Sequence, residues 1–122
     1  MTLTTEDLGD LPDVDAATMG GVLTTDAFGK FAILSASDEA FIQAGNDWAP
    51  GLACEAFMAV QGSDPWVLEY RESGRQFRAA GPVTLEQVHW AFRSYLAGVR
   101  DWHSGFSWGE PGCEPQTLNM PP

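Results

Sequence analysis

The sequence has few basic residues. Its 122 residues include 17 acidic side chains and six basic ones, so the formal net charge is −11. Lys30 is the single lysine. Proteins that bind DNA or RNA directly neutralise phosphates with clusters of lysine and arginine. The shortage of these residues argues against a protein that binds nucleic acid directly.

Long apolar runs and cysteines are also scarce. No stretch approaches the roughly 20 apolar residues of a membrane span, and the first residues lack the basic and apolar regions of a secretory signal. Cys54 and Cys113 are too few for the disulfide framework of a small secreted scaffold, so we expect two thiols rather than a disulfide. These absences predict a cytoplasmic protein with no membrane partner.

Motifs of catalysis and cofactor binding are missing as well. No serine lies in a nucleophile-elbow pattern, no glycine pattern fits a phosphate loop, and the two histidines lack the close spacing of a zinc site. Neighbouring carboxylates such as Asp38 and Glu39 are expected by chance among 17 acids. We therefore predict no catalytic residue, no metal and no cofactor. An enzyme would need carboxylates or histidines that converge in a cleft.

The length and the 44% hydrophobic content are sufficient for one folded core. Residues 30–108 are expected to form a single α+β domain. Residues 1–29 hold six acids and no base, and we expect a short irregular or helical segment there that belongs to the domain or packs on it. Residues 109–122 are rich in Gly and Pro and are expected to form a loosely held tail.

Alternation of apolar and polar residues with a period of two predicts an antiparallel meander of about five strands. Short turns between the strands predict hairpins, the last of which turns at residues 73–74. In that register, Tyr70 faces Phe77 on the covered face of the sheet. Glu69 then faces Arg78 on the solvent-exposed face. The predicted strands are residues 30–36, 40–45, 54–61, 66–72 and 75–80.

One amphipathic helix is predicted near the C-terminus, packed on a face of the sheet. Thr84 is a typical N-cap, Gln87 completes a capping box, and Gly98 is a typical end. Trp90 projects from the polar side of this helix. Residues 106–108 are expected to form a last short strand or a cap on the core. The apolar face carries Leu85, Val88, Ala91, Phe92, Tyr95 and Leu96, and the polar side carries Glu86, Arg93 and Ser94.

Charge is distributed unevenly along the chain, which suggests a docking surface. Residues 1–70 sum to −11, residues 71–100 to +3 and the last stretch to −3. An acidic surface suits a basic partner, although the same acidity also serves solubility. Exposed tryptophans are common in binding hot spots, but Trp90 is equally compatible with cover by another segment. The candidate partner-binding residues are Asp38, Glu39, Asp47, Trp48 and Trp90.

The second half of the chain resembles a bacterial family. The runs LEYRESGRQFRA and GPVTLEQVHWAFRSYLAG, with the closing tryptophan of DWHSGFSW, are similar to the first of the numbered immunity-protein families, which are encoded beside polymorphic toxins, notably deaminase toxins. The resemblance spans about Trp66 to Trp108. It implies a small cytoplasmic protein without catalytic activity that occupies the active site or substrate groove of a cognate toxin, whose cleft would be basic. The positions that carry it are Leu68, Glu69, Tyr70, Gly74, Thr84, Glu86, Gln87, Phe92, Tyr95, Gly98 and Trp108.

Two hypotheses of function result. The first is an immunity-like protein that binds and neutralises a toxin through an acidic surface and an exposed aromatic side chain. The alternative is a small α+β domain that binds an apolar ligand between sheet and helix. Its pocket would be lined by Trp66, Tyr70, Phe92, Trp102, Phe106 and Trp108.

Overall fold

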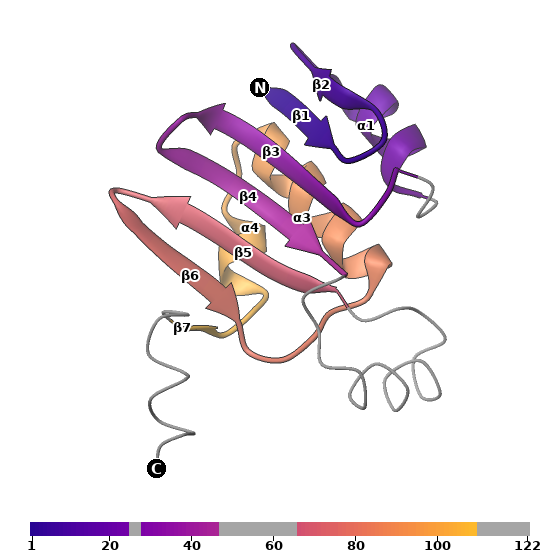
Figure 1. Ribbon diagram of the computed structural model, residues 1–122. Helices are drawn as coiled ribbons and strands as arrows, with labels where there is room; N and C mark the ends of the chain where they lie inside the picture. Colours follow the sequence, from indigo (N-terminus) through magenta and orange to yellow (C-terminus); the bar gives the residue numbers. More distant parts are fainter. Residues whose placement is uncertain (25–27, 47–65, 110–122) are drawn as a thin grey trace.

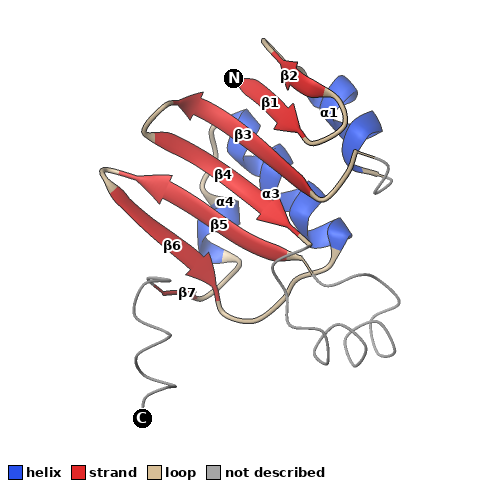
Figure 2. Ribbon diagram, in the orientation of Figure 1, coloured by secondary structure: helices blue, strands red, loops and turns tan. Residues whose placement is uncertain are grey.

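The computed structural model describes residues 1–24, 28–46 and 66–109. The strands are β1 (Thr2–Thr5), β2 (Gly9–Leu11), β3 (Phe31–Ser37), β4 (Ala40–Gly45), β5 (Val67–Glu72), β6 (Arg75–Ala79) and β7 (Trp108–Gly109), and the helices are α1 (Ala16–Leu23), α3 (Leu85–Ala97) and α4 (Asp101–Ser104). All seven strands form one antiparallel sheet in the order β2-β1-β3-β4-β5-β6-β7. The helices lie on one face of the sheet (Figure 1; Figure 2).

The α+β class is therefore confirmed, but its details differ from the prediction. The sheet has seven strands rather than about five, and the described residues contain three helices rather than one. None of these helices is long and apolar enough to cross a membrane. Residues 110–122, the predicted tail, lie outside the described residues.

The N-terminal segment is an integral part of the sheet. Strand β1 pairs with β2 on one side and with β3 on the other. Helix α1 follows β2, with Asp15 as its N-cap. The prediction of a short helical segment within residues 1–29 is confirmed by α1, but it is wrong for residues 2–11, which contain two strands. Strands of three and four residues carry too little alternation to be recognised, and β1 is fixed by its pairing with a strand far along the chain.

The two hairpins with short turns were predicted correctly. Strand β3 pairs with β4, and β5 pairs with β6 in the predicted register, with Tyr70 opposite Phe77 and Glu69 opposite Arg78. The predicted meander order is wrong at β5, because the neighbours of β5 in the sheet are β4 and β6. Residues 54–61 themselves lie outside the described residues.

A row of apolar side chains crosses the sheet beneath the helices. Successive strand pairings place Leu3, Leu34, Ile42, Tyr70 and Phe77 next to one another. The first four are buried in the same core as the inner face of α3, and Phe77 packs against that core. The sheet therefore presents its apolar face to α3, as the period of two requires.

Helix α3 begins and ends where the sequence predicts. The Thr84 side chain accepts a hydrogen bond from the backbone of Gln87 at 3.1 Å, and the Gln87 side chain accepts one from the backbone of Thr84 at 2.8 Å. Gly98 ends the helix in the left-handed conformation, with φ of 81°. Val88, Ala91, Phe92 and Tyr95 are buried as expected.

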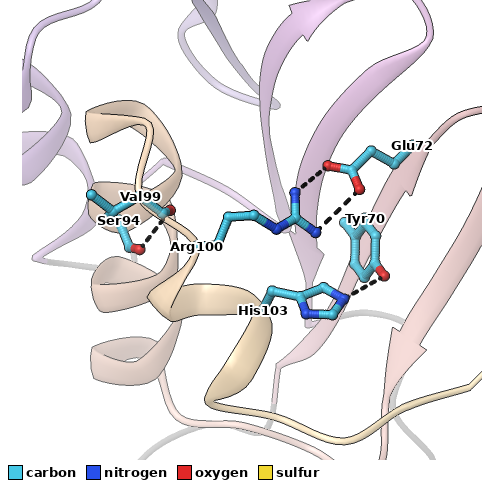
Figure 3. Close-up of polar contacts among 6 residues, drawn as sticks. All are labelled: Tyr70, Glu72, Ser94, Val99, Arg100 and His103. Atoms are coloured by element: carbon cyan, nitrogen blue, oxygen red, sulfur yellow. Dashed lines mark hydrogen bonds and ion pairs between the residues drawn. The ribbon is translucent and has the colours of Figure 1, made fainter.

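Ser94 departs from the predicted polar face, since it is buried. Its hydroxyl donates to the carbonyl of Val99 at 3.2 Å and accepts the backbone N–H of Trp102 at 3.1 Å. The first of these contacts is drawn in Figure 3. A serine at this position holds α4 against the end of α3, which helical spacing alone does not reveal.

Candidate functional site

Five exposed carboxylates lie on the N-terminal elements, at the edge of the sheet formed by β2. We call Glu6, Asp7, Asp10, Asp13 and Asp15 the acidic edge. They occupy the β1–β2 turn, β2 itself and the segment that leads into α1, and residues 1–24 contain no lysine or arginine. The acidity of residues 1–29 is visible in the sequence, but these five residues were not predicted as a site, because the sequence pattern does not show that strands β1 and β2 belong to the sheet.

Short hydrogen bonds fix three of these carboxylates. The Thr4 hydroxyl donates to Asp10 at 2.7 Å, and the backbone N–H of Lys30 donates to Glu6 at 2.8 Å. Asp15 accepts the backbone N–H of Thr18 at 2.7 Å. This hydrogen bond lowers the pKa of Asp15 below its ordinary value, because it favours the ionised form. The acidic edge therefore carries negative charge on ordered side chains.

Two of the predicted acids lie in the turn between β3 and β4. Asp38 and Glu39 are both exposed, and the Glu39 carboxylate lies 3.5 Å from Nε of Arg71. Asp47 and Trp48 lie outside the described residues. Of the five predicted partner-binding residues, the structure thus places two in one turn and Trp90 on α3. Trp90 lines a surface hollow on α3, and neither Asp38 nor Glu39 lines that hollow.

The arginines of the opposite half are largely compensated by carboxylates. Arg71 pairs with Glu39, Arg78 with Glu69 at 2.7 Å, and Arg100 with both carboxylate oxygens of Glu72 at 2.8 and 3.2 Å. The last pair joins the segment before α4 to β5 (Figure 3). Three of the five arginines between residues 71 and 100 are therefore neutralised locally.

Glu69 contradicts the prediction of a solvent-exposed sheet face. The residue is only 4% exposed. Its carboxylate accepts hydrogen bonds from Gln43 at 2.8 Å, Gln76 at 2.9 Å and Arg78 at 2.7 Å. Cross-strand pairing places Gln43 and Arg78 on either side of Glu69, so the sheet itself builds this network. Buried charge of this kind is tolerated because every oxygen has a donor.

A surface hollow of about 490 Å³ lies on the outer side of α3. Trp90 lines it and is 36% exposed, the largest exposure of any described tryptophan. The indole packs edge-on against Phe106, with ring centroids 6.0 Å apart. A Cβ added to Gly105 would lie 2.7 Å from the indole ring. The hollow is lined by Glu86, Gln87, His89, Trp90, Arg93, Gly105 and Phe106.

His89 connects this hollow to α1. A Cβ on Gly20 would lie 3.4 Å from Nε2 of His89, so the imidazole packs against the backbone of α1. Burial lowers the pKa of His89, and the positive charge of Arg93 lowers it further. The imidazole is therefore neutral at pH 7. Helical spacing predicted that Trp90 neighbours Glu86 and Arg93, whereas Gly105 and Phe106 reach the hollow only through the path of the chain after α4.

A cluster of aromatic rings surrounds Tyr70 on β5, next to α4 and β7. The Tyr70 ring lies between Phe77, Trp102 and Trp108, with centroids 4.7 to 5.1 Å apart. The Tyr70 hydroxyl lies 3.1 Å from Nε2 of His103 (Figure 3). Burial, reinforced by the charge of Glu72, raises the pKa of Tyr70 above its ordinary value. Tyr70 is therefore a neutral hydrogen-bonding group at pH 7.

Most rings of the predicted ligand pocket belong to the core. Trp66, Tyr70, Phe92 and Trp102 are all buried, and Trp66 packs on Phe28 with centroids 5.4 Å apart. Phe106 and Trp108 are half-buried, and Phe106 is the only one of the six that lines the hollow on α3. A ligand site between sheet and helix stays a prediction.

The two histidines lie apart, His89 beside α1 and His103 beside Tyr70. Within the described ranges, no three His, Cys, Asp or Glu side chains converge as a set of metal ligands. Comparisons with protein-family models, curated proteins and solved structures found no match to this chain. The features that bear on function are therefore the acidic edge, the hollow on α3 and the sequence resemblance.

Proposed function

We propose that the protein is a cytoplasmic, non-catalytic, immunity-like protein that neutralises a cognate toxin by docking an acidic surface against a basic cleft. The acidic edge is the observation that carries this proposal. Its five exposed carboxylates are distributed along the β1–β2 hairpin, which forms one edge of the sheet, and the segment that leads into α1. A field of one sign accelerates the encounter with a partner of the opposite sign and disfavours partners of the same sign.

The opposite half of the molecule supports the same view. Arg71, Arg78 and Arg100 each have a carboxylate partner within the protein, so they offer little positive field to compete with the acidic edge. A toxin that acts on nucleic acid needs a basic cleft to hold phosphates, which is the complement of such a surface. Asp38 and Trp90 remain candidates for additional contacts, the first by charge and the second as an aromatic anchor.

Co-expression with the product of the adjacent gene tests the proposal. We expect that product to co-purify with this protein and to lose its toxicity, with an affinity that falls as salt concentration rises. The variant D7N/D10N/D13N removes three charges from the acidic edge while it keeps side-chain shape, and Asn tolerates the positive φ of 52° at position 13. We expect weaker binding and a smaller salt dependence for this variant.

A matched control variant distinguishes the effect of the acidic edge on binding from the effect of the net charge of the protein. The variant D101N/E110Q/E114Q changes the net charge equally at positions outside the edge, and its affinity should stay close to that of the wild-type protein. Equal losses in both triple variants would refute the role of the acidic edge. An adjacent gene whose product neither binds nor harms cells would refute the immunity function itself.

A further inference from the structure

The hollow on the outer side of α3 has opposite charges at its two ends. Glu86 and Arg93 both line it and are seven residues apart on the helix, a separation of about 10 Å along the axis. Neither side chain forms an ion pair with another residue in the part of the chain that the structure describes. The middle of the hollow is formed by Trp90 and, from the side, by Phe106.

The walls of this hollow are held in place before any ligand arrives. The capping box at Thr84 and the left-handed Gly98 fix the two ends of α3. The Trp90 indole is confined by the backbone at Gly105 and by the Phe106 ring, yet more than a third of it is exposed. An ordered aromatic surface binds with a smaller loss of side-chain entropy than a mobile one.

The charges of the hollow restrict what it can hold. A purely acidic ligand would meet Glu86 and the field of a protein with a net charge of −11. A purely basic ligand would bring its second charge next to Arg93. His89 lies between them, faces Arg93 and α1, and adds no charge at pH 7. A ligand with a cation at one end, a carboxylate at the other and an apolar body between them meets a favourable group at each position.

We propose that this hollow is a subsite that takes a segment of the toxin in which a basic and an acidic residue, about 10 Å apart, flank an apolar side chain. The cation lies toward Glu86, the apolar side chain covers Trp90 and Phe106, and the carboxylate lies toward Arg93. This inference rests on the proposed function for the identity of the partner. The two surfaces then have different roles in binding. The acidic edge accelerates the encounter with the toxin, and the hollow on α3 selects the toxin by its side chains.

Short peptides test the chemistry of the hollow without the toxin. The probe is the acetylated and amidated tetrapeptide Lys-Leu-Pro-Glu, and its two controls are Lys-Leu-Pro-Lys and Glu-Leu-Pro-Glu. In the polyproline II conformation, residues three apart lie on one side of the chain at a distance of about 9 Å. Binding to the full chain is followed by the NMR shift of the Trp90 indole N–H during titration.

We expect the mixed peptide to bind at least about threefold more tightly than either control, a difference of about 0.7 kcal/mol. The variant Glu86→Gln should reduce this preference for the mixed peptide over the acidic one. Trp90→Ala should abolish binding, and because this variant lacks the indole, its titration is followed through the backbone N–H resonance of Arg93. Asp101→Asn, which changes an exposed acid that does not line the hollow, should leave all three affinities unchanged. Equal shifts with all three peptides, or no shift of the Trp90 resonance with any of them, would overturn the proposal.

The two proposals can fail separately. The variant D7N/D10N/D13N leaves the hollow intact, so its response to the mixed peptide should match that of the wild-type protein even though its binding to the toxin is weakened. A toxin that binds with full affinity to Trp90→Ala and Glu86→Gln, but weakly to the acidic-edge variant, would overturn the subsite and leave the proposed function standing.

Discussion

The indole of Trp90 occupies the space that a side chain at Gly105 would need. A Cβ at position 105 would lie 2.7 Å from one ring atom and 2.8 Å from another. Gly105 itself has an ordinary helical backbone, with φ of −79°. Glycine is therefore needed here because the aromatic ring comes close, and not because of backbone strain. This contact forms one wall of the hollow on α3.

Gly105→Ala should therefore destabilise the fold by about 1–3 kcal/mol, the usual effect of an added methyl group in a tightly packed place. The new methyl group must displace the Trp90 ring, which should also shift its indole N–H resonance. Urea unfolding measures the free energy, and Trp90→Ala provides the background for a double-mutant cycle. In that background the alanine should cost much less. An equal cost in both backgrounds would show that the ring is not the cause.

Glu69→Gln should cost about 2–4 kcal/mol of stability, because it removes the charge that compensates Arg78 and brings an amide NH2 among three donors. Glu39→Gln is the matched control. Glu39 also faces an arginine, but its side chain is 74% exposed and the distance is 3.5 Å, so we expect a loss below about 0.5 kcal/mol. Thermal unfolding of both variants at neutral pH distinguishes them, and similar losses would contradict the buried network.

Stability should fall as the pH decreases through the ordinary pKa of histidine, 6.5, because of His89. Its pKa is lowered in the folded protein, so between the two pKa values the unfolded chain binds more protons than the folded one. Acid therefore favours unfolding. His89→Gln should reduce the loss of unfolding free energy between about pH 7.5 and about pH 5.5, measured in urea. A variant with the same pH dependence as the wild-type protein would show that His89 is not the source of the effect.

Gly21→Ala should stabilise the protein by about 0.5–1 kcal/mol. Gly21 lies inside α1, where glycine is unfavourable, and nothing lies within 4 Å of an added Cβ. Gly20→Ala is a closely related comparison, since its Cβ would touch His89 at 3.4 Å. We expect a smaller gain there. Calorimetric midpoints of both variants test this, and a larger gain at position 20 would contradict the described packing of α1 on α3.

Local patterns were sufficient for much of the second half of the chain. The register of Tyr70 with Phe77 and of Glu69 with Arg78 results from a two-residue turn and a period of two, both of which are visible in the sequence. The start of α3 at Thr84 and its end at Gly98 likewise depend on side chains within a few residues. The polar position of Trp90 was also predicted by helical spacing.

Interactions between distant parts of the chain decided what the sequence patterns did not. The alternation of apolar and polar residues identifies a strand but not its neighbour in the sheet. Only the structure shows that β1 lies between β2 and β3, and that β4 pairs with β5. The sequence pattern predicts that Glu69 is an exposed acid. Its burial is possible only because hydrogen-bond donors from two neighbouring strands reach its carboxylate.

By itself, the sequence determined the α+β class, the caps of α3, the register of one hairpin and the uneven distribution of charge, because each depends on composition or on residues close together in the chain. Only the tertiary structure decided that the N-terminal acids line a sheet edge and that Phe106 and Gly105 enclose Trp90. Those arrangements depend on which surfaces bury each other when the whole chain folds, and that free energy is shared among residues far apart in sequence.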